Sequence, residues 1–421
     1  MENRRLFFLL ASIVLATISI VSCDKDSMIE PNESFYADPN AVSSKEAVNV
    51  AEAYILSDKK ITTRADGLKV KSYSSIKDEV GSDIIHVFNY EGGGFALISG
   101  DNRLEPVLAY SESASFGNDV NAFPVGLRIW VEGIKSKLDK IKSDDLPQEA
   151  SIKCLWDKYN GVVMTRSLDP WSGIDPECDT IVGPLLTNTW HQYASYNDYL
   201  IDAYHFNTFT NMYDTLHKPV VGCVPLSIAR VLHFWGYPTS YPWSSMSSTS
   251  ENHYNKTFLS DVHYDVKNYA ESHSYYFGYC YYPSVSAPRN YATSVSTTFP
   301  IGTFICYRYG YASATTIDYS TSQNYTIRRE LFDYGRPVII GGTNSGGSGH
   351  AWVCDGYRYK YEHFYDSDMN PIGVATNLLY HRWGEPNSQF DGWYIPSNVD
   401  PENSGYGYNT NMTLTYQIQP Y

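Results

Sequence analysis

The alternation of hydrophobic and polar positions predicts a small folded unit in the first third of the chain. Apolar residues recur at helical spacing from 46 to 64, which predicts an amphipathic helix. Two apolar runs, 84–89 and 95–99, flank a run of glycines and predict a β-hairpin, to which 101–110 adds a third strand. A second amphipathic helix is expected over 124–138. Together these elements predict an α+β unit.

A different pattern follows. From 143 to 176 the periodicity weakens and Asp, Pro, Ser and Arg accumulate, which predicts a linker or an exposed segment. Short tyrosine-rich strands with few helices are expected from 177 to 421. The best helix candidates there are 225–235 and 325–334, each followed directly by a glycine. The second stretch is long enough to form a domain with a core of its own.

A glycine-rich loop at 341–349 separates two apolar runs, 337–340 and 351–355. The runs are expected to pair as strands across this loop. The loop lacks the Gly-Lys-Ser/Thr ending of phosphate-binding loops, so it does not predict a nucleotide site.

The amino terminus has the features of an export signal. Arg5 precedes an apolar run, 6–21, which is followed by the small residue Ser22 and then Cys23. A cysteine directly after the small residue predicts a bacterial lipoprotein with Cys23 acylated. A plain signal peptide with a chance cysteine, or an uncleaved membrane helix, stays open. The polar, proline-containing residues 24–45 suit a tether.

Charge and composition narrow the function classes. The chain has 31 Lys and Arg against 46 Asp and Glu, a net charge of −15. With no local basic patch, no nucleic-acid partner is expected. Beyond Cys23 the six remaining cysteines are scattered without a CxxC pair, so neither a zinc site nor a dense disulfide framework is predicted. One disulfide, of undetermined pairing, stays open.

Two residues have the local setting of a nucleophile and its base. Cys223 precedes Pro225, a residue that favours the first turn of a helix, and a thiolate is favoured at that end of a helix. Gly222 would leave room for a substrate backbone. His350 follows the glycine-rich loop and opens an apolar strand, so its imidazole is expected at a strand edge near a cleft. A base for a catalytic cysteine typically comes from such a distant part of the chain.

Two segments resemble the streptopain-like cysteine peptidases, which have a papain-like fold. Residues 222–238 read GCVPLSIARVLHFWGYP, and residues 349–357 read GHAWVCDGY. The resemblance implies that Cys223 is the nucleophile and His350 the general base. It implies no cofactor and no metal.

Further motifs extend the resemblance over nearly the whole chain after the tether. Residues 184–197 are similar to the family segment whose glutamine donates to the oxyanion, and this implies that role for Gln192. Residues 88–110 resemble part of the family's inhibitory propeptide.

One motif departs from the family pattern. The family has an Asn-Trp-Gly-Trp-Gly segment whose asparagine orients the imidazole and whose tryptophan shields that contact. Here Trp383 matches, but Arg382 occupies the asparagine position and cannot accept the imidazole N–H. Either Asn387 or a backbone carbonyl replaces the asparagine, or the base is poorly held. The stretch after His350 is also lengthened by 359–377.

The expected organisation follows from these patterns and the resemblance: a lipoprotein signal peptide at 1–22, a tether at 23–45, an inhibitory propeptide domain at 46–142, a linker and processing region at 143–176, and a papain-like cysteine peptidase domain at 177–421. Arg166 is one candidate processing site. The expected location is a bacterial outer membrane or cell surface, with release after processing open.

The expected function is that of a secreted endopeptidase, made as an inactive precursor, which binds its own propeptide and cleaves proteins or peptides. Two alternatives stay open. Arg382 motivates a degenerate peptidase homologue that acts as a binding protein, and the 38 Tyr and 9 Trp motivate a surface glycan-binding lipoprotein.

Overall fold

A computed structural model of the chain describes residues 38–58, 69–117, 119–161, 177–283, 285, 289–320, 323–343, 348–365, 370–396 and 412–421. Several sequence-based predictions lie outside these residues: the signal peptide 1–22, the lipidated Cys23, the tether up to 37, the end of the first helix at 59–64, and Arg166.

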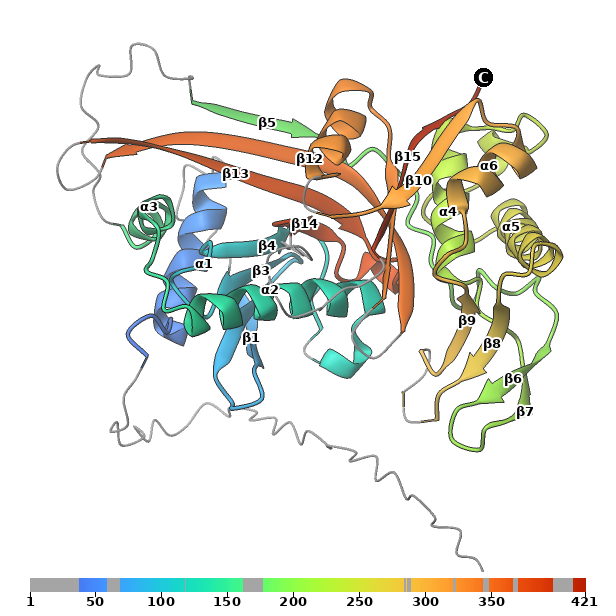
Figure 1. Cartoon of the computed structure of the whole chain (residues 1–421), viewed down its shortest axis with the longest axis horizontal. Helices are drawn as coiled ribbons and strands as arrows, with labels where there is room; N and C mark the ends of the chain where they lie inside the picture. The colour runs from blue at the N-terminus through green and yellow to red at the C-terminus, as the bar shows by residue number, and fades with distance from the viewer. Residues whose placement is uncertain are drawn as a thin grey trace, which may run out of the picture.

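The amino-terminal unit is a four-stranded antiparallel meander covered by helices (Figure 1). Its elements are α1 Ser44–Asp58, β1 Val70–Lys77, β2 Asp83–Tyr90, β3 Phe95–Ser99, β4 Val107–Ser111, the short η2 Val120–Ala122, α2 Val125–Ser143 and α3 Ala150–Tyr159. The predicted hairpin and both predicted helices are present. The third strand is shorter than expected because 101–106 form a turn.

The second unit mixes helices and strands. Its elements are β5 Cys178–Val182, β6 Ala203–Asn207, β7 Met212–His217, α4 Cys223–Trp235, η3 Trp243–Ser245, α5 His253–Ser272, β8 Phe277–Tyr281, β9 Tyr291–Val295, α6 Ile301–Tyr309, β10 Ser313–Asp318, α7 Asn324–Arg328, the π-helical η5 Arg329–Asp333, β11 Val338–Thr343, β12 Gly349–Tyr365, β13 Pro371–Arg382, η6 Pro386–Ser388, β14 Gly392–Tyr394 and β15 Thr413–Gln419. The expected pairing of β11 with β12 is confirmed.

Two sequence-based expectations were wrong. The segment 143–176 is not all linker, because α3 lies within it and packs Cys154 and Leu155 against Phe364 and Val374. The second unit also has more helix than expected, since α5 and α6 were missed. The buried residues of α5 recur at helical spacing, but tyrosines and polar residues between them weaken the hydrophobic pattern.

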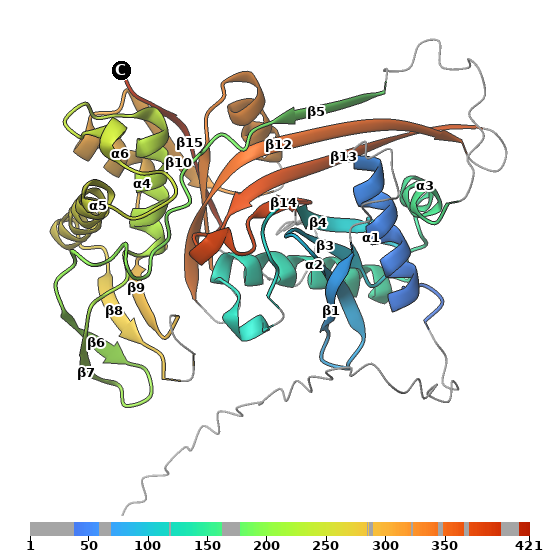
Figure 2. The same cartoon turned by 180° about the vertical axis from the view of Figure 1, so that it is seen from behind.

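One eleven-stranded sheet runs through both units, in the order β1-β2-β3-β4-β14-β13-β12-β11-β15-β10, with β5 paired to the middle of β12 at 357–361 (Figures 1 and 2). The junction is the pairing of β4 with β14, in which Tyr110 lies opposite Trp393 and Ala109 opposite Tyr394. Backbone hydrogen bonds therefore join the two units in addition to side-chain packing. A separate four-stranded sheet, β7-β6-β8-β9, lies beside α5.

The two faces of β12 belong to different cores. Ala351 and Val353 pack in the core that contains α4, α5 and α6, whereas Trp352 and Cys354 pack in the core shared with the amino-terminal unit. This is the alternation expected of a strand buried on both sides. The helix α2 of the first unit contacts β11 and β12, and α4 contacts β12 and β11. The start of β12 therefore lies where the two units meet.

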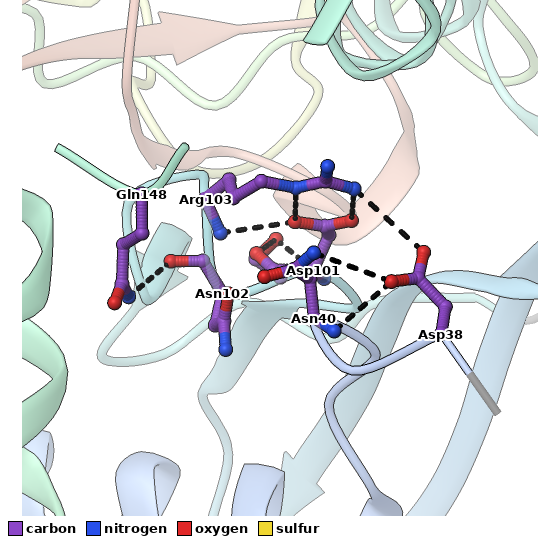
Figure 3. A network of polar contacts seen from close by, with 7 residues as sticks. Asp38, Asn40, Asp101, Asn102, Arg103 and Gln148 are labelled. Atoms are coloured by element: carbon purple, nitrogen blue, oxygen red, sulfur yellow. Dashed lines mark hydrogen bonds and ion pairs between the residues drawn. The ribbon is translucent and has the colours of Figure 1, made fainter. Parts of the chain in front are cut away.

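A polar network holds the first described residues to the amino-terminal unit (Figure 3). Arg103 forms a bidentate pair with Asp101, with its Nη2 2.7 Å from Oδ2 and its Nε 2.9 Å from Oδ1, and lies 3.7 Å from Asp38. Gln148 donates to the carbonyl oxygen of Asn102 at 2.6 Å. The network connects the chain before α1, the turn between β3 and β4, and the segment after α2.

Within the described residues, no helix is both long and apolar enough to cross a membrane. The six cysteines there are free thiols. No group of three or more His, Cys, Asp or Glu side chains in this part of the chain is arranged to hold a metal ion.

Candidate active site

Cys223 is the first residue of α4, so the helix predicted over 225–235 begins two residues earlier than expected. Gly222 caps this end with φ 94°, a left-handed conformation that favours glycine, and a Cβ at this position would lie 3.1 Å from Cβ of Thr293. Gly222 is therefore required by the backbone turn. The helix ends at Gly236, whose φ of 58° forms a left-handed cap.

The segment before Cys223 is held on three sides. Val221 N donates to the carbonyl oxygen of Gln192 at 2.9 Å, and the carbonyl oxygen of Val221 lies 2.8 Å from Nδ1 of His263. Thr293 Oγ1 donates to the carbonyl oxygen of Val220 at 2.6 Å. The segments carrying Gln192 and Cys223 are thus joined directly. Nothing in the sequence pattern singled out His263 or Thr293.

A cavity of about 740 Å3 brings the three predicted site residues together. Gln192, Cys223 and His350 all line it. The amino-terminal unit contributes residues around the start of α2 to the same cavity: Phe123, Pro124, Val125 and Arg128. The propeptide candidate therefore covers the site that its own chain would use.

The imidazole of His350 is held by the backbone. Its Nε2 lies 3.0 Å from the carbonyl oxygen of Trp383. Because a carbonyl only accepts, Nε2 carries the proton, and Nδ1 is the nitrogen left to act as a base. The sequence left two replacements open for the family asparagine that orients the imidazole: Asn387 or a backbone carbonyl. In the structure the backbone carbonyl of Trp383 contacts the imidazole. Asn387 makes no hydrogen bond to His350 among the contacts of the described residues.

No hydrogen bond joins Cys223 to His350 within the described part of the chain. The backbone N–H of Ala351, the residue after His350, acts on the thiol and lowers its pKa. The imidazole packs against α2, since a Cβ added to Gly126 would lie 3.0 Å from Cδ2 of His350 and 2.8 Å from the ring of Trp352. The side chains of Cys223 and His350 therefore line one cavity without a hydrogen bond between them.

Electrostatics favours the neutral forms of both groups. Burial raises the pKa of the Cys223 thiol, although the N–H groups of Ala351, Val224 and Cys223 itself act in the opposite direction. The helix terminus alone therefore does not produce the thiolate that the sequence led us to expect. Burial also lowers the pKa of His350, while the Trp383 carbonyl and Glu385 raise it and Arg128 lowers it further. A thiolate–imidazolium pair is disfavoured in this closed state.

Arg382 has a structural role. Its Nε donates to Oδ2 of Asp355 at 2.9 Å, and its Nη2 donates to the carbonyl oxygen of Leu186. Asp355 Oδ2 also accepts from Leu186 N at 2.8 Å. Trp383, the next residue, is fully buried, and its backbone N–H donates to Oδ1 of Asp391 at 2.8 Å. Arg382 thus ties β13 to the segment that leads to Gln192.

The sequence reasoning missed one charged cluster in the cavity. Glu385 is 1% exposed and forms an ion pair with Arg289, whose Nη2 lies 2.7 Å from Oε2. Tyr193 donates to Oε1 of Glu385 at 3.4 Å and accepts from Nε2 of Gln192 at 3.3 Å. The sequence signal that could have pointed to Glu385 is its position two residues after Trp383, within the segment that matches the family motif.

Two family models match this chain. The one described as Spi protease inhibitor matches residues 39–138, and the one described as Peptidase C10 family matches residues 190–394. Residues 190–394 belong to the peptidase C10 family. The chain thus places a segment that matches an inhibitor propeptide before a segment that matches a cysteine peptidase domain.

Two relatives of this C10 peptidase agree with that assignment. It is 22% identical over 368 residues to the thiol protease/hemagglutinin PrtT of Porphyromonas gingivalis, an alignment that covers 80% of this chain and 37% of that protein. The chain thus spans little more than a third of that relative's length. A solved fragment of prointerpain A from Prevotella intermedia superposes with a TM-score of 0.54 at 20% identity, covering 83% of this chain and 99% of the fragment. This likeness supports the expected fold of a propeptide domain followed by a peptidase domain.

Proposed function

We propose that this chain is the precursor of an exported, lipid-anchored cysteine endopeptidase in which Cys223 is the nucleophile and His350 the general base. The observation that carries the proposal is that Gln192, Cys223 and His350, from three distant parts of the chain, line one cavity. These residue types are the ones that covalent acyl transfer needs: a nucleophile, a base and an oxyanion donor.

The proposed reaction starts when Nδ1 of His350 takes the proton of the Cys223 thiol. The sulfur attacks the carbonyl carbon of a peptide bond, and the resulting oxyanion accepts from Nε2 of Gln192 and the backbone N–H of Cys223. The imidazolium of His350 then protonates the leaving amine as the C–N bond breaks. Water, deprotonated by His350, hydrolyses the thioester and restores the thiol. No cofactor takes part.

The propeptide is proposed to keep this site latent in two ways. Residues at the start of α2 line the cavity and would exclude a substrate chain. Contact with α2 also buries His350, and burial lowers the pKa of its imidazole. Cleavage within 162–176, with Arg166 as one candidate site, would separate the propeptide and restore both access and basicity.

Export and anchoring are proposed from the amino terminus. The apolar run 6–21 followed by Ser22 and Cys23 supports acylation of Cys23 and attachment to a bacterial outer membrane or cell surface. A Cys23→Ser chain expressed in a bacterial host is expected to lose incorporation of labelled fatty acid and to leave the membrane fraction. Retention of label by the variant would contradict the anchor.

The peptidase proposal is tested on the purified precursor with a thiol-directed peptidyl epoxide and with casein. The wild-type chain is expected to become labelled as it is processed and to cut casein internally, whereas Cys223→Ala is expected to do neither. Cys306→Ala is the matched control, since Cys306 is also a partly buried thiol in the same domain.

Two results would contradict this assignment. Labelling of the Cys223→Ala chain would place the nucleophile elsewhere. A folded, processed wild-type chain that takes no label and leaves casein intact would favour a degenerate homologue that only binds peptides.

A further inference from the structure

We propose that Glu385 is a positioning residue for this peptidase: its carboxylate stabilises the imidazolium form of His350 and connects it, through Tyr193, to the oxyanion donor Gln192. The inference deepens the proposed function and rests on its assignment of Cys223 and His350. The inference goes beyond that proposal by assigning a charged positioning residue, Glu385, to the site of Cys223 and His350.

The placement of Glu385 supports this role. The side chain lines the same cavity as Cys223 and His350 and is almost fully buried. A buried carboxylate needs a partner, and Arg289 supplies one at 2.7 Å. Burial raises the pKa of Glu385, while the charges of Arg289 and His350 act in the opposite direction and favour the carboxylate. The hydroxyl of Tyr193 donates a hydrogen bond to Oε1 of Glu385 at 3.4 Å. The carboxylate is therefore fixed in place from two sides.

The charge acts on the correct group. His350 receives its orientation from the Trp383 carbonyl, which accepts a hydrogen bond from Nε2 but carries only a partial charge. The Glu385 carboxylate lines the same cavity as the imidazole, and its negative charge raises the pKa of His350. In a cysteine peptidase the imidazolium must persist beside the thiolate, so a buried anion in the same cavity favours the reactive pair.

Other titratable or charged groups line this cavity from the surrounding elements: Arg128 on α2, Tyr193 before β6, Cys223 on α4, Tyr276 and Tyr282 at the two ends of β8, Arg289 before β9, and Tyr291 on β9. Arg128 is the one that opposes Glu385, since it lowers the pKa of His350. Arg128 belongs to the propeptide region. Its departure after processing would leave Glu385 with the stronger influence on the imidazole.

The test is the pH dependence of kcat/KM of the full-length chain after it has been allowed to process, with a soluble peptide substrate. Loss of the imidazolium sets the basic limb of this profile. Glu385→Gln keeps the shape but removes the charge, and is expected to lower the basic-limb midpoint by about one pH unit, with about tenfold lower activity on that side. Glu385→Asp keeps the charge and is expected to restore the midpoint toward that of the wild type.

Controls separate the possible failures. Glu271→Gln removes a charge on α5 that pairs with Lys267, and is expected to leave both limbs unchanged. If a variant precursor does not process, the pH dependence of the rate at which iodoacetamide alkylates Cys223 reports the ionisation of the Cys223–His350 pair instead. The inference would be overturned if Glu385→Gln kept the basic-limb midpoint of the wild type while Glu385→Asp lost activity. The shape of the side chain, and not its charge, would then be what matters. Activity retained by Cys223→Ala or His350→Ala would instead overturn the proposed function.

Discussion

Gly126 of the propeptide lies directly against the imidazole of His350, so closely that a Cβ at this position would come within 3.0 Å of Cδ2. The same Cβ would lie 2.8 Å from the rings of Trp352 and Trp383. These contacts place the inhibitory helix α2 on the residue whose protonation the proposed reaction requires. The absence of a side chain at one position of α2 permits this approach.

Adding a methyl group at Gly126 is expected to weaken latency. Gly126→Ala would force three buried rings apart, an overpacking that typically costs about 1–3 kcal/mol. The precursor is therefore expected to process several-fold faster, as followed by gel analysis of precursor against time. Ser136→Ala, a partly exposed change on the same helix, should process at the wild-type rate. Unchanged processing by Gly126→Ala would show that this contact does not limit activation.

Loss of the Gln192 amide is expected to slow the chemical step. Removing one oxyanion donor costs about 10²- to 10³-fold in kcat in comparable sites. Gln192→Ala should therefore lower kcat of the processed enzyme strongly while KM changes little, because the amide acts mainly in the transition state. Gln419→Ala removes an exposed glutamine from β15 and should have wild-type kinetics. A change confined to KM would argue against the oxyanion role.

Restoring the family residue at position 382 is expected to harm the protein. Arg382→Asn would leave the buried Asp355 without its guanidinium partner, and breaking such a pair from one side costs about 3–5 kcal/mol. Urea unfolding of the precursor carrying Cys223→Ala measures this loss without autolysis. The paired change Arg382→Met with Asp355→Asn removes both charges and should be less unstable. If Arg382→Asn unfolds like its parent, the pair has no structural role.

Two buried histidines, His263 and His381, and the half-buried His191 are expected to make the fold sensitive to acid. Burial lowers the pKa of His381 to about 3 and those of His191 and His263 to about 4. Their ordinary pKa is higher in the unfolded chain, so the unfolded chain takes up protons first, and stability present above about pH 6.5 is lost as the pH falls.

His381→Gln removes one of the three histidines that take up a proton on unfolding. The glutamine keeps an acceptor for Nε1 of Trp352, which lies 3.1 Å from Nδ1 of His381. The variant is expected to flatten the loss of unfolding free energy between pH 6 and 4 by about 1.4 kcal/mol per pH unit. Urea unfolding across that range measures it, with the exposed His253→Gln as control. Equal slopes for His381→Gln and the parent would mean that His381 is protonated in the folded state.

Much of the local structure was predictable from the chain alone. The glycines at 92–94 and the apolar runs beside them specified the β2–β3 hairpin, because neighbouring residues decide a tight turn. Gly222, Pro225 and Gly236 in the same way marked the two ends of α4. The motifs around Cys223 and His350 indicated the family, which the matching family models bear out.

What the sequence could not specify depends on contacts between distant segments. The hydrogen bond from His350 to the Trp383 carbonyl involves a backbone atom that every residue has, so no side-chain pattern indicates it. The helix α3 was mistaken for linker because its buried face is complete only against Phe364 and Val374. Glu385 acquires its surroundings from Arg289 and Tyr193, two segments brought together by folding. Local sequence thus indicated many of the elements and the residues proposed to react, while tertiary packing decided the charges, burial and partners around those residues.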